Sequence, residues 1–266
     1  MNKKFQISVG LTLLLTLALQ ACGPATPESP QLPTIEPSPS VAQLSEPQTV
    51  ESGLCANPLY PVKQGASWTY QSTGGLSGDF SFTDTVTEVR EDGFTLTSQV
   101  DSTNVTQEWT CTPEGLASLS FGNGAAGGLS TSGVHMDLST SNLQGVILPP
   151  SVNAGDEWTY SLDYDGTMEY QETIAETQGT ARFAFNAVGE ESVTVPAGTF
   201  NAMKIHVDLV LEMQATFSGF TAPLVFTIPT DIWYAPDVGW VKASSSGDLF
   251  GMAFNESIEL RSYNIP

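Results

Sequence analysis

The sequence has little positive charge. It contains 8 Lys and Arg residues against 29 Asp and Glu residues, which gives a net charge of -21 over 266 residues. The first 22 residues hold Lys3, Lys4 and no acid, so the rest of the chain carries 6 bases and 29 acids, a net charge of -23. A chain this negative repels phosphate, which argues against nucleic acid as a partner and against adsorption to anionic lipid headgroups.

Metal-binding and catalytic motifs are equally scarce. The two histidines, His135 and His206, are far apart in the sequence, and no His/Cys spacing fits a zinc site. Neither a G-x-S-x-G elbow nor a glycine-rich phosphate loop occurs. The acidic segment 163–169 resembles a calcium loop, but it lacks the third acid and the distant glutamate, so a hairpin turn at 163–166 is favoured. We therefore predict no catalytic residue, no metal ligand and no cofactor.

A long apolar run occurs near the N-terminus. Two lysines precede a leucine-rich run that ends at Leu19-Gln20-Ala21-Cys22. A positive start, a short apolar run and a small residue before the cut are typical of a secretory signal peptide. The last four residues resemble the lipobox of bacterial lipoprotein precursors, which implies cleavage after Ala21 and attachment of lipid to Cys22.

We accordingly predict that residues 1–21 are a lipoprotein signal peptide and that the lipid on Cys22 anchors the protein to a membrane. Each buried methylene of an acyl chain contributes about 0.8 kcal/mol, so two or more chains anchor a protein firmly. An ordinary signal peptide with a chance cysteine and an uncleaved N-terminal anchor are the alternatives. No later segment is long and apolar enough to span a bilayer as a helix.

Residues 22–53 have the composition of a tether. Seven prolines are interleaved with Ser, Thr, Gln and four glutamates, and there is no aromatic residue. Such a stretch cannot bury enough apolar surface to fold, so we predict a disordered, partly polyproline-II linker. A ligand for a proline-binding module is the alternative. Gly23 stands where an aspartate would favour retention at the inner membrane of a two-membrane cell, so the sequence gives no reason for such retention.

The remaining cysteines fit an oxidising compartment. Once lipid occupies Cys22, only Cys55 and Cys111 are left, which is an even pair in an exported chain. A disulfide between them would close a long loop and stabilise the fold by about 4 kcal/mol in the chain-entropy model. Two separate buried thiols and a redox pair are the alternatives, although there is no C-x-x-C spacing. We predict a structural disulfide.

Residues 54–266 alternate between apolar and polar side chains. In the segment 203–213 every second residue, from Met203 to Met213, is apolar, and the residues between them are mostly polar. Weaker alternation occurs at 80–90, 94–100, 107–111, 182–188, 224–228 and 257–265. Turn-forming residues separate these runs at 91–93, 163–166 and 246–248. The pattern predicts a single all-β domain of antiparallel strands.

One short motif occurs twice. The pattern Gly-x-x-Trp-Thr-Tyr stands at residues 65–70 and again at 155–160, each time after a proline and a short loop. A repeat at this distance predicts two similar halves, at about 54–147 and 148–266, that begin with the same hairpin. Residues 122–133 between them are rich in Gly, Ala and Ser, which predicts a mobile loop.

The second half resembles a known family. Its motifs are G-x-x-W-x-Y at 155–160, V-T-V-P-A-G-T-F at 193–200 and D-x-W-Y-A-P-x-V-G at 231–239. The last two place proline and glycine at turn positions and predict β-hairpins. Together the motifs resemble a bacterial envelope family of unknown function, whose members are secreted or lipid-anchored and similar in fold to the LolA/LolB lipoprotein-carrier half-barrels. The resemblance implies a curved antiparallel sheet, or half-barrel, around an apolar concavity, and it implies no catalytic residue.

Three functions remain open. The favoured one is a non-catalytic lipoprotein, anchored in the cell envelope and facing the periplasm or the cell exterior, that binds an apolar or amphipathic ligand such as lipid in the half-barrel. The second is a surface interaction or adhesion module with an envelope protein as partner. The third is an envelope hydrolase, for which two carboxylates would have to converge in a cleft at roughly 5–9.5 Å.

Overall fold

The computed structural model describes residues 53–120, 134–170, 173–217, 219–249 and 252–266. The predicted signal peptide, Cys22, nearly all of the tether and the predicted loop at 122–133 lie outside these residues. The described residues form twelve strands and no helix, so none of them belongs to a helix that could cross a membrane. The strands are β1 (Ser67–Thr73), β2 (Phe80–Arg90), β3 (Gly93–Val100), β4 (Thr103–Thr112), β5 (Gly115–Ser118), β6 (Val134–Gly145), β7 (Glu157–Tyr170), β8 (Thr173–Val195), β9 (Gly198–Phe217), β10 (Phe220–Ala235), β11 (Gly239–Leu249) and β12 (Met252–Asn264).

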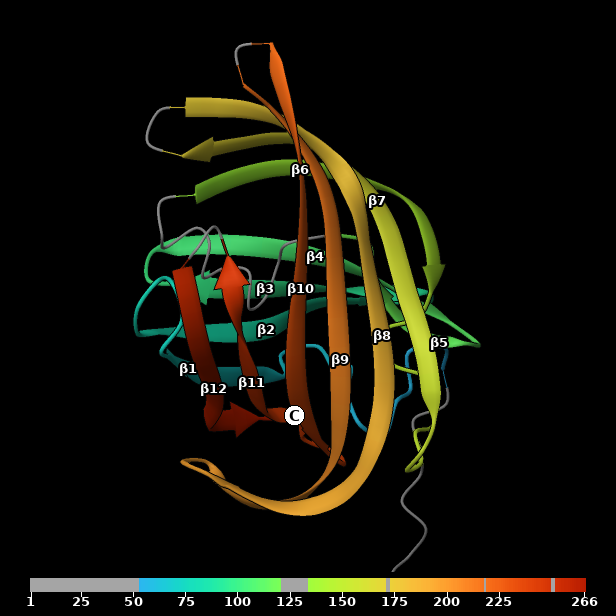
Figure 1. The fold of residues 1–266 in the computed structure, drawn as a ribbon. Coiled ribbons are helices and arrows are strands. Elements are labelled where there is room, and N and C mark those ends of the chain that lie inside the picture. The colour runs from blue at the N-terminus through green and yellow to red at the C-terminus, as the bar shows by residue number, and fades with distance from the viewer. Residues whose placement is uncertain (1–52, 121–133, 171–172, 218, 250–251) are drawn as a thin grey trace, which may run out of the picture. The chain divides into compact units, whose positions relative to one another are not determined.

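All twelve strands lie in one antiparallel sheet (Figure 1). Strands that follow one another in sequence pair with each other, except that β12 pairs with β1 and that β5 and β6 form the two ends of the sheet. A bridge between Leu116 in β5 and Leu148, just after β6, joins these ends at one point. The predicted all-β antiparallel fold is confirmed, and the sheet closes further than a half-barrel, into a nearly closed barrel.

Apolar alternation predicts strands well where one face of the sheet is buried. The predicted strands at 80–90 and 94–100 match β2 and β3 to within one residue. The run 203–213 lies inside β9, with Ile205 and Val207 buried and His206 on the opposite face. The two hairpins predicted from proline and glycine join β8 to β9 and β10 to β11.

Two predicted turns are wrong. Residues 163–166 lie in the middle of β7, and residues 246–248 lie within β11. A Cβ atom at Gly166 would collide with the carbonyl oxygen of Asp137 in β6, so the glycine allows close approach of a neighbouring strand rather than a turn. In β11, the ring of Phe254 lies against Gly247 in the same way. His135, which the sequence places in a loop, has its backbone in β6.

The repeated Gly-x-x-Trp-Thr-Tyr motif folds in the same way twice. Gly65 before β1 and Gly155 before β7 have φ angles of 85° and 90°, which favour glycine. The N–H of Gly65 donates to the carbonyl oxygen of Val86 at 2.8 Å, and that of Gly155 donates to the carbonyl oxygen of Ala187 at 2.7 Å. A β-bulge follows Val86 in β2, and another follows Ala187 in β8. The motif therefore fixes the first hairpin of each half.

The aromatic residues of the motif also have equivalent roles. The indole N–H groups of Trp68 and Trp158 donate to backbone carbonyl oxygens of other segments. The hydroxyl groups of Tyr70 and Tyr160 do the same. Trp68, Tyr70 and Tyr160 are buried and Trp158 is partly buried, and each has its polar atom satisfied, as buried Trp and Tyr require.

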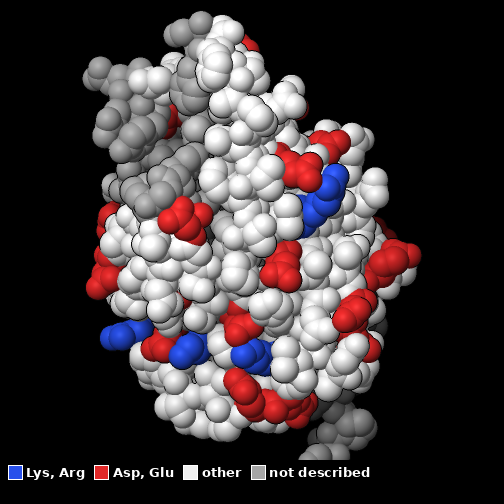
Figure 2. All heavy atoms as spheres, in the orientation of Figure 1, with Lys and Arg blue, Asp and Glu red and all other residues white. Residues whose placement is uncertain are grey.

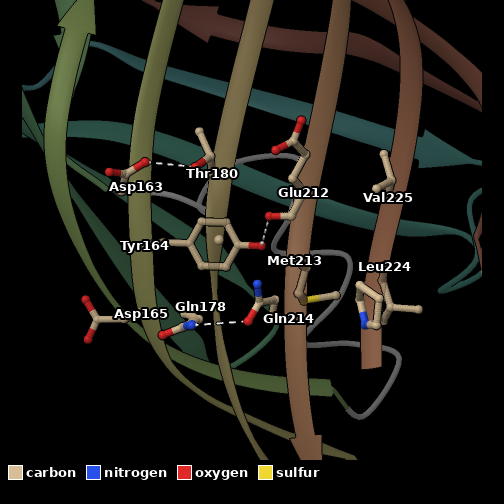
Figure 3. Close-up of a pocket in the computed structure, with 12 residues that line it drawn as sticks. Asp163, Tyr164, Asp165, Gln178, Thr180, Glu212, Met213, Gln214, Leu224 and Val225 are labelled. Carbon is tan, nitrogen blue, oxygen red and sulfur yellow. Dashed lines mark hydrogen bonds between the residues drawn. The ribbon is translucent and has the colours of Figure 1, made fainter. Parts of the chain in front are cut away.

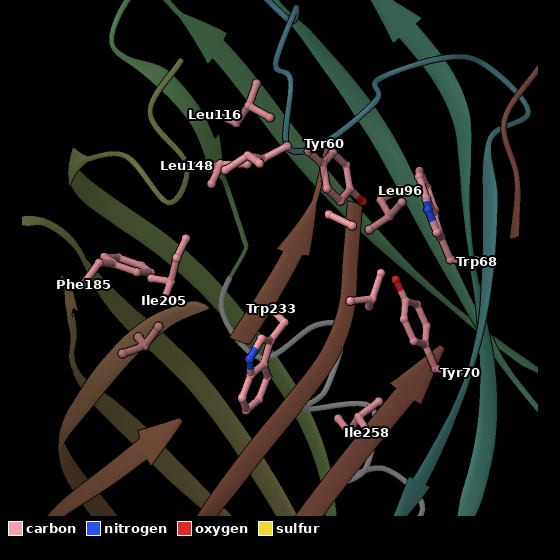
Figure 4. Packing of buried hydrophobic residues seen from close by; sticks show 14 of the residues in the cluster. Tyr60, Trp68, Tyr70, Leu96, Leu116, Leu148, Phe185, Ile205, Trp233 and Ile258 are labelled. Atoms are coloured by element: carbon pink, nitrogen blue, oxygen red, sulfur yellow. The ribbon is translucent and has the colours of Figure 1, made fainter. Parts of the chain in front are cut away.

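Stacked aromatic rings fill the core beside the first-half strands (Figure 4). Tyr60 stacks on Trp68, with ring centroids 5.3 Å apart. Tyr70 stacks on Trp240 of β11, with ring centroids 3.8 Å apart. The protein's own side chains therefore occupy the interior in this part of the barrel.

A disulfide joins Cys55 to Cys111 near the end of β4. Both cysteines are buried, and they are 56 residues apart in the sequence. The bond ties the segment before β1 to β4, as the even cysteine pair predicts.

Candidate functional site

The inner face of the sheet, which carries the core residues, is not buried evenly along β9. Ile205 and Val207 are 1% and 5% exposed. Leu209 and Leu211 continue the same face toward the far end of the strand, but they are only partly buried. Met213 and Ala215, further along the same face, are buried again, so Leu209 and Leu211 form a partly buried apolar stretch between buried residues of β9.

The neighbouring strand β10 extends this partly buried apolar surface. Ile228 lies opposite Leu209, and Phe226 lies opposite Leu211. Leu224 follows Phe226 on the same face, and all three β10 side chains are partly buried. We refer to this surface as the inner patch, formed by Leu209, Leu211, Leu224, Phe226 and Ile228.

A polar row borders the inner patch on the same face. Thr230 in β10 pairs with Ser245 in β11, and Ser245 pairs with Glu256 in β12. Ser72 of β1, which is fully buried, donates a hydrogen bond from its hydroxyl group to Oε1 of Glu256 at 2.6 Å. The row therefore places a carboxylate beside the inner patch.

Glu256 itself is partly buried. Burial raises the pKa of Glu256, and the hydrogen bond from Ser72 offsets part of this rise. Phe254, two residues earlier in β12, lies on the same face and contacts Gly247 in β11. An acid next to apolar surface can hold a molecule that has a polar head and an apolar tail.

A groove with a volume of about 500 Å³ crosses β7, β8, β9 and β10 (Figure 3). Most of its walls are side chains of the outer, solvent-exposed face, and Val225 is 67% exposed beside it. The lining residues are Asp163, Tyr164, Asp165, Gln178, Gly179, Thr180, Glu212, Met213, Gln214, Pro223, Leu224 and Val225. The groove is therefore acidic and amide-rich on one side and apolar along β10.

The acids of this outer groove are ordinary surface carboxylates. Hydrogen bonds from Asn142 and Thr180 lower the pKa of Asp163, which is exposed. Glu212 pairs with Arg182 at 3.0 Å. Figure 2 shows that the face of the molecule seen there carries more acidic than basic side chains. A raised pKa, which a general acid needs near neutral pH, is not found for Asp163.

A cluster of charged residues surrounds Trp233 on the outer face of β10. The Nζ atoms of Lys204 and Lys242 lie 5.1 and 5.9 Å from the centre of its ring. Lys204 pairs with Asp231 at 2.8 Å, and Lys242 pairs with Glu259 at 3.1 Å. Both lysines are thus neutralised within the cluster, which stabilises the packing of Trp233.

His206 belongs to the same cluster. Its Nδ1 lies 2.7 Å from Oδ1 of Asp231, and its Nε2 lies 3.6 Å from Oδ1 of Asp208. Burial alone would raise the pKa of Asp231, but hydrogen bonds from Lys204 and His206 outweigh burial and lower it. Within the described ranges, no three His, Cys, Asp or Glu side chains come together as metal ligands.

Two carboxyl groups with raised pKa lie apart on the inner face. Asp84 in β2 is 2% exposed and lies opposite Trp68 of β1. Glu256 is held by Ser72, four residues further along β1. At about 3.3 Å per residue, these β1 positions are about 13 Å apart. This separation exceeds the span of a glycosidase carboxylate pair.

The second half of the chain matches a known family. Residues 127–248 match the family model described as DUF3108-like. This range contains all three second-half motifs, so the resemblance to an envelope family of unknown function is confirmed. No curated protein matches the chain.

Several solved structures are similar to the chain. A candidate exported protein with a YmcC-like fold from Bacteroides fragilis is 15% identical, with a TM-score of 0.46, over 77% of this chain and 98% of the other. A candidate lipoprotein from Parabacteroides distasonis is 15% identical, with a TM-score of 0.44, over 79% and 99%. The hypothetical lipoprotein YmcC from Escherichia coli is 10% identical, with a TM-score of 0.35, over 76% and 85%. None of these descriptions names a ligand or an activity, and the likeness to LolA/LolB carriers stays a prediction.

Proposed function

We propose that the protein is a non-catalytic lipoprotein of the cell envelope that binds an amphipathic ligand on the inner patch. The observation that carries this proposal is the incomplete burial of Leu209, Leu211 and Phe226 on a face that also carries the buried residues Ile205, Val207 and Met213. Covering apolar surface stabilises a complex by about 25 cal/mol per Å². A ligand with an apolar chain would therefore gain free energy on this surface.

The sequence supports a location in the envelope. The lipobox at Cys22 would attach the chain to a membrane, and the proline-rich tether would let the β domain extend away from it. The β domain, residues 54–266, holds 25 acids and 6 bases, and this net charge of -19 would keep it off anionic headgroups. A tethered domain of this kind is suited to taking up a single amphipathic molecule near a membrane.

Native mass spectrometry of the mature chain tests this function. Residues 23–266, exported behind a cleavable signal peptide, should carry a bound molecule that extracts as lipid. Leu211→Gln should lower the bound fraction, because it places an amide in the inner patch. The matched control Val210→Gln changes the next residue, which faces the other side of β9, and should leave binding unchanged. A protein that carries no ligand and takes up none on incubation with envelope lipid would contradict the proposal.

A second candidate function is a surface interaction module. The outer groove and the exposed Val225 beside it favour this function. Cross-linking on intact cells should then capture an envelope protein with the wild-type chain but not with Val225→Glu. Capture that survives this substitution would show that the groove is not the contact surface.

A further inference from the structure

The end of the inner patch that meets the polar row carries a negative group. Glu256 lies on the inner face of β12, in register with Ser245 and, one strand further, with Thr230. A carboxylate offers two oxygens and about four acceptor positions. Among the described residues, the hydroxyl group of Ser72 donates a hydrogen bond to this carboxylate, at Oε1. The carboxylate can therefore accept further hydrogen bonds from a ligand.

The basic residues of the neighbouring strands do not face this carboxylate. Arg182, Lys204 and Lys242 pair with acids on the outer face of the sheet. Among the described residues, no Lys, Arg or His side chain forms an ion pair with Glu256. An anionic headgroup at this position would meet Glu256 and would be repelled, whereas a cationic one would be attracted.

The geometry of the patch suits a single alkyl chain. Leu209 and Leu211 on β9 face Ile228 and Phe226 on β10, and together with Leu224 they extend over about 13 Å along the strands, at 3.3 Å per residue. Such a length accommodates a chain of medium length. Thr230 follows Ile228 on the same face of β10, so the patch meets the polar row at that end. The apolar surface and the carboxylate therefore lie in the order that a chain with a headgroup requires.

We propose that the inner patch and Glu256 together bind a single-chain amphiphile whose headgroup is a protonated amine. The alkyl chain lies against Leu209, Leu211 and Phe226, and the ammonium group donates hydrogen bonds to the carboxylate of Glu256. Thr230 and Ser245 supply hydroxyl groups beside the same headgroup. This inference rests on the function proposed above and adds the class of ligand.

Isothermal titration of the mature chain, residues 23–266, with three amphiphiles tests the inference. Dodecylamine, dodecanol and dodecanoate share a chain length and differ in the charge of the headgroup, and each is used below its micelle concentration. A hydrogen bond between charged groups discriminates by about tenfold or more. The wild-type chain should bind dodecylamine at least about tenfold more tightly than dodecanoate, with dodecanol between them.

Two substitutions on β12 distinguish the effect of the Glu256 carboxylate on binding from the effect of the chain's overall negative charge. Glu256→Gln keeps an acceptor for Ser72 and should abolish the preference for dodecylamine. Glu259→Gln removes an acid of the same strand whose side chain pairs with Lys242 on the outer face, and it should retain the preference. Near-ultraviolet circular dichroism verifies the fold of each variant. If Glu256→Gln does not fold, the comparison of the three amphiphiles on the wild-type chain still decides the proposal.

The outcomes distinguish this inference from the function on which it rests. Equal binding of dodecylamine and dodecanoate, or a preference that survives Glu256→Gln, overturns the amine assignment. If Leu211→Gln weakens the binding of all three amphiphiles in that case, the proposed function stands. If the wild-type chain binds none of them, both proposals are overturned.

Discussion

Asp84 provides the sharpest test of the physical reasoning about this fold. Its carboxyl group is 2% exposed in the barrel core, opposite Trp68 in β1. Ser98 of β3 donates a hydrogen bond to it. Burial raises its pKa from 3.8 to about 6, and the hydrogen bond from Ser98 offsets only part of this rise. Asp84→Asn keeps the shape and an acceptor for Ser98 but removes the charge.

The sign and size of the effect follow from proton linkage. The folded pKa of about 6 lies above the unfolded value of 3.8, so the favourable contribution of protonated Asp84 is fully present below pH 3.8 and is lost as pH rises through 6. Each pKa unit corresponds to about 1.4 kcal/mol, so ionised Asp84 destabilises the fold by about 3 kcal/mol at pH 7.5. Asp84→Asn should therefore stabilise the protein by about 3 kcal/mol at pH 7.5 and by less than about 1 kcal/mol at pH 4.

Urea unfolding at the two pH values, with the disulfide intact, measures this difference. Asp165→Asn, at an exposed position in β7, serves as the matched control and should change the free energy of unfolding little at either pH. The decisive quantity is the change in the effect of Asp84→Asn between pH 4 and pH 7.5. The reasoning would be refuted if that effect were the same at both pH values, or if the substitution destabilised the fold at pH 7.5.

Three further variants test other parts of the fold. Replacing Cys55 and Cys111 by serine should lower the free energy of unfolding by about 4 kcal/mol, because the disulfide closes a loop of 56 residues; a loss below about 1 kcal/mol in chemical denaturation would contradict this. Gly179→Ala should destabilise the fold by more than about 2 kcal/mol, because its Cβ would lie 2.8 Å from Cζ of Tyr164 and would collide with a backbone oxygen of β9. An unchanged melting temperature would show that the strands can move apart. Tyr70→Phe removes a hydrogen bond to a backbone carbonyl of β11 and should cost about 1–3 kcal/mol in thermal or urea unfolding.

The sequence predicts those parts of the fold that depend on local pattern. Alternation locates β2, β3 and the centre of β9, because one face of each is buried and the side-chain period of a strand is two. The hairpins that contain proline and glycine follow from local dihedral preferences. The disulfide follows from the even cysteine count and the predicted signal peptide, and this inference needs no knowledge of the fold.

The errors arise where a distant strand decides the structure. Residues 163–166 have the composition of a turn, yet they lie within β7. There Gly166 allows the backbone of β6 to approach closely, because a Cβ atom would collide with it. The bulge after Ala187 shifts the register of β8 on β9, so that Ala187 pairs with Ile205 but Gly189 pairs with Lys204. Neither fact can be read from the local sequence, since each depends on the partner strand.

The candidate site was only half predictable for the same reason. The alternation at 203–213 assigns Leu209 and Leu211 to the apolar face from sequence alone. Glu256 stands among polar neighbours in the sequence, and nothing local distinguishes it from a surface acid. Only the pairing of β12 with β1 and β11 places it next to Ser72 and the inner patch.

The inner patch follows from a difference in strand length between the two halves. The repeated motif gives β1 and β7 the same start, but β1 to β4 contain 7, 11, 8 and 10 residues, whereas β7 to β10 contain 14, 23, 20 and 16. The aromatic rings that fill the core, such as Trp68 and Tyr70, come largely from the shorter strands. Figure 1 shows that the ribbons of β9 and β10 extend beyond the first-half strands. On these longer strands Leu209, Leu211 and Phe226 are only partly buried. The additional length of β9 and β10 is therefore the part of the fold that is best explained by binding.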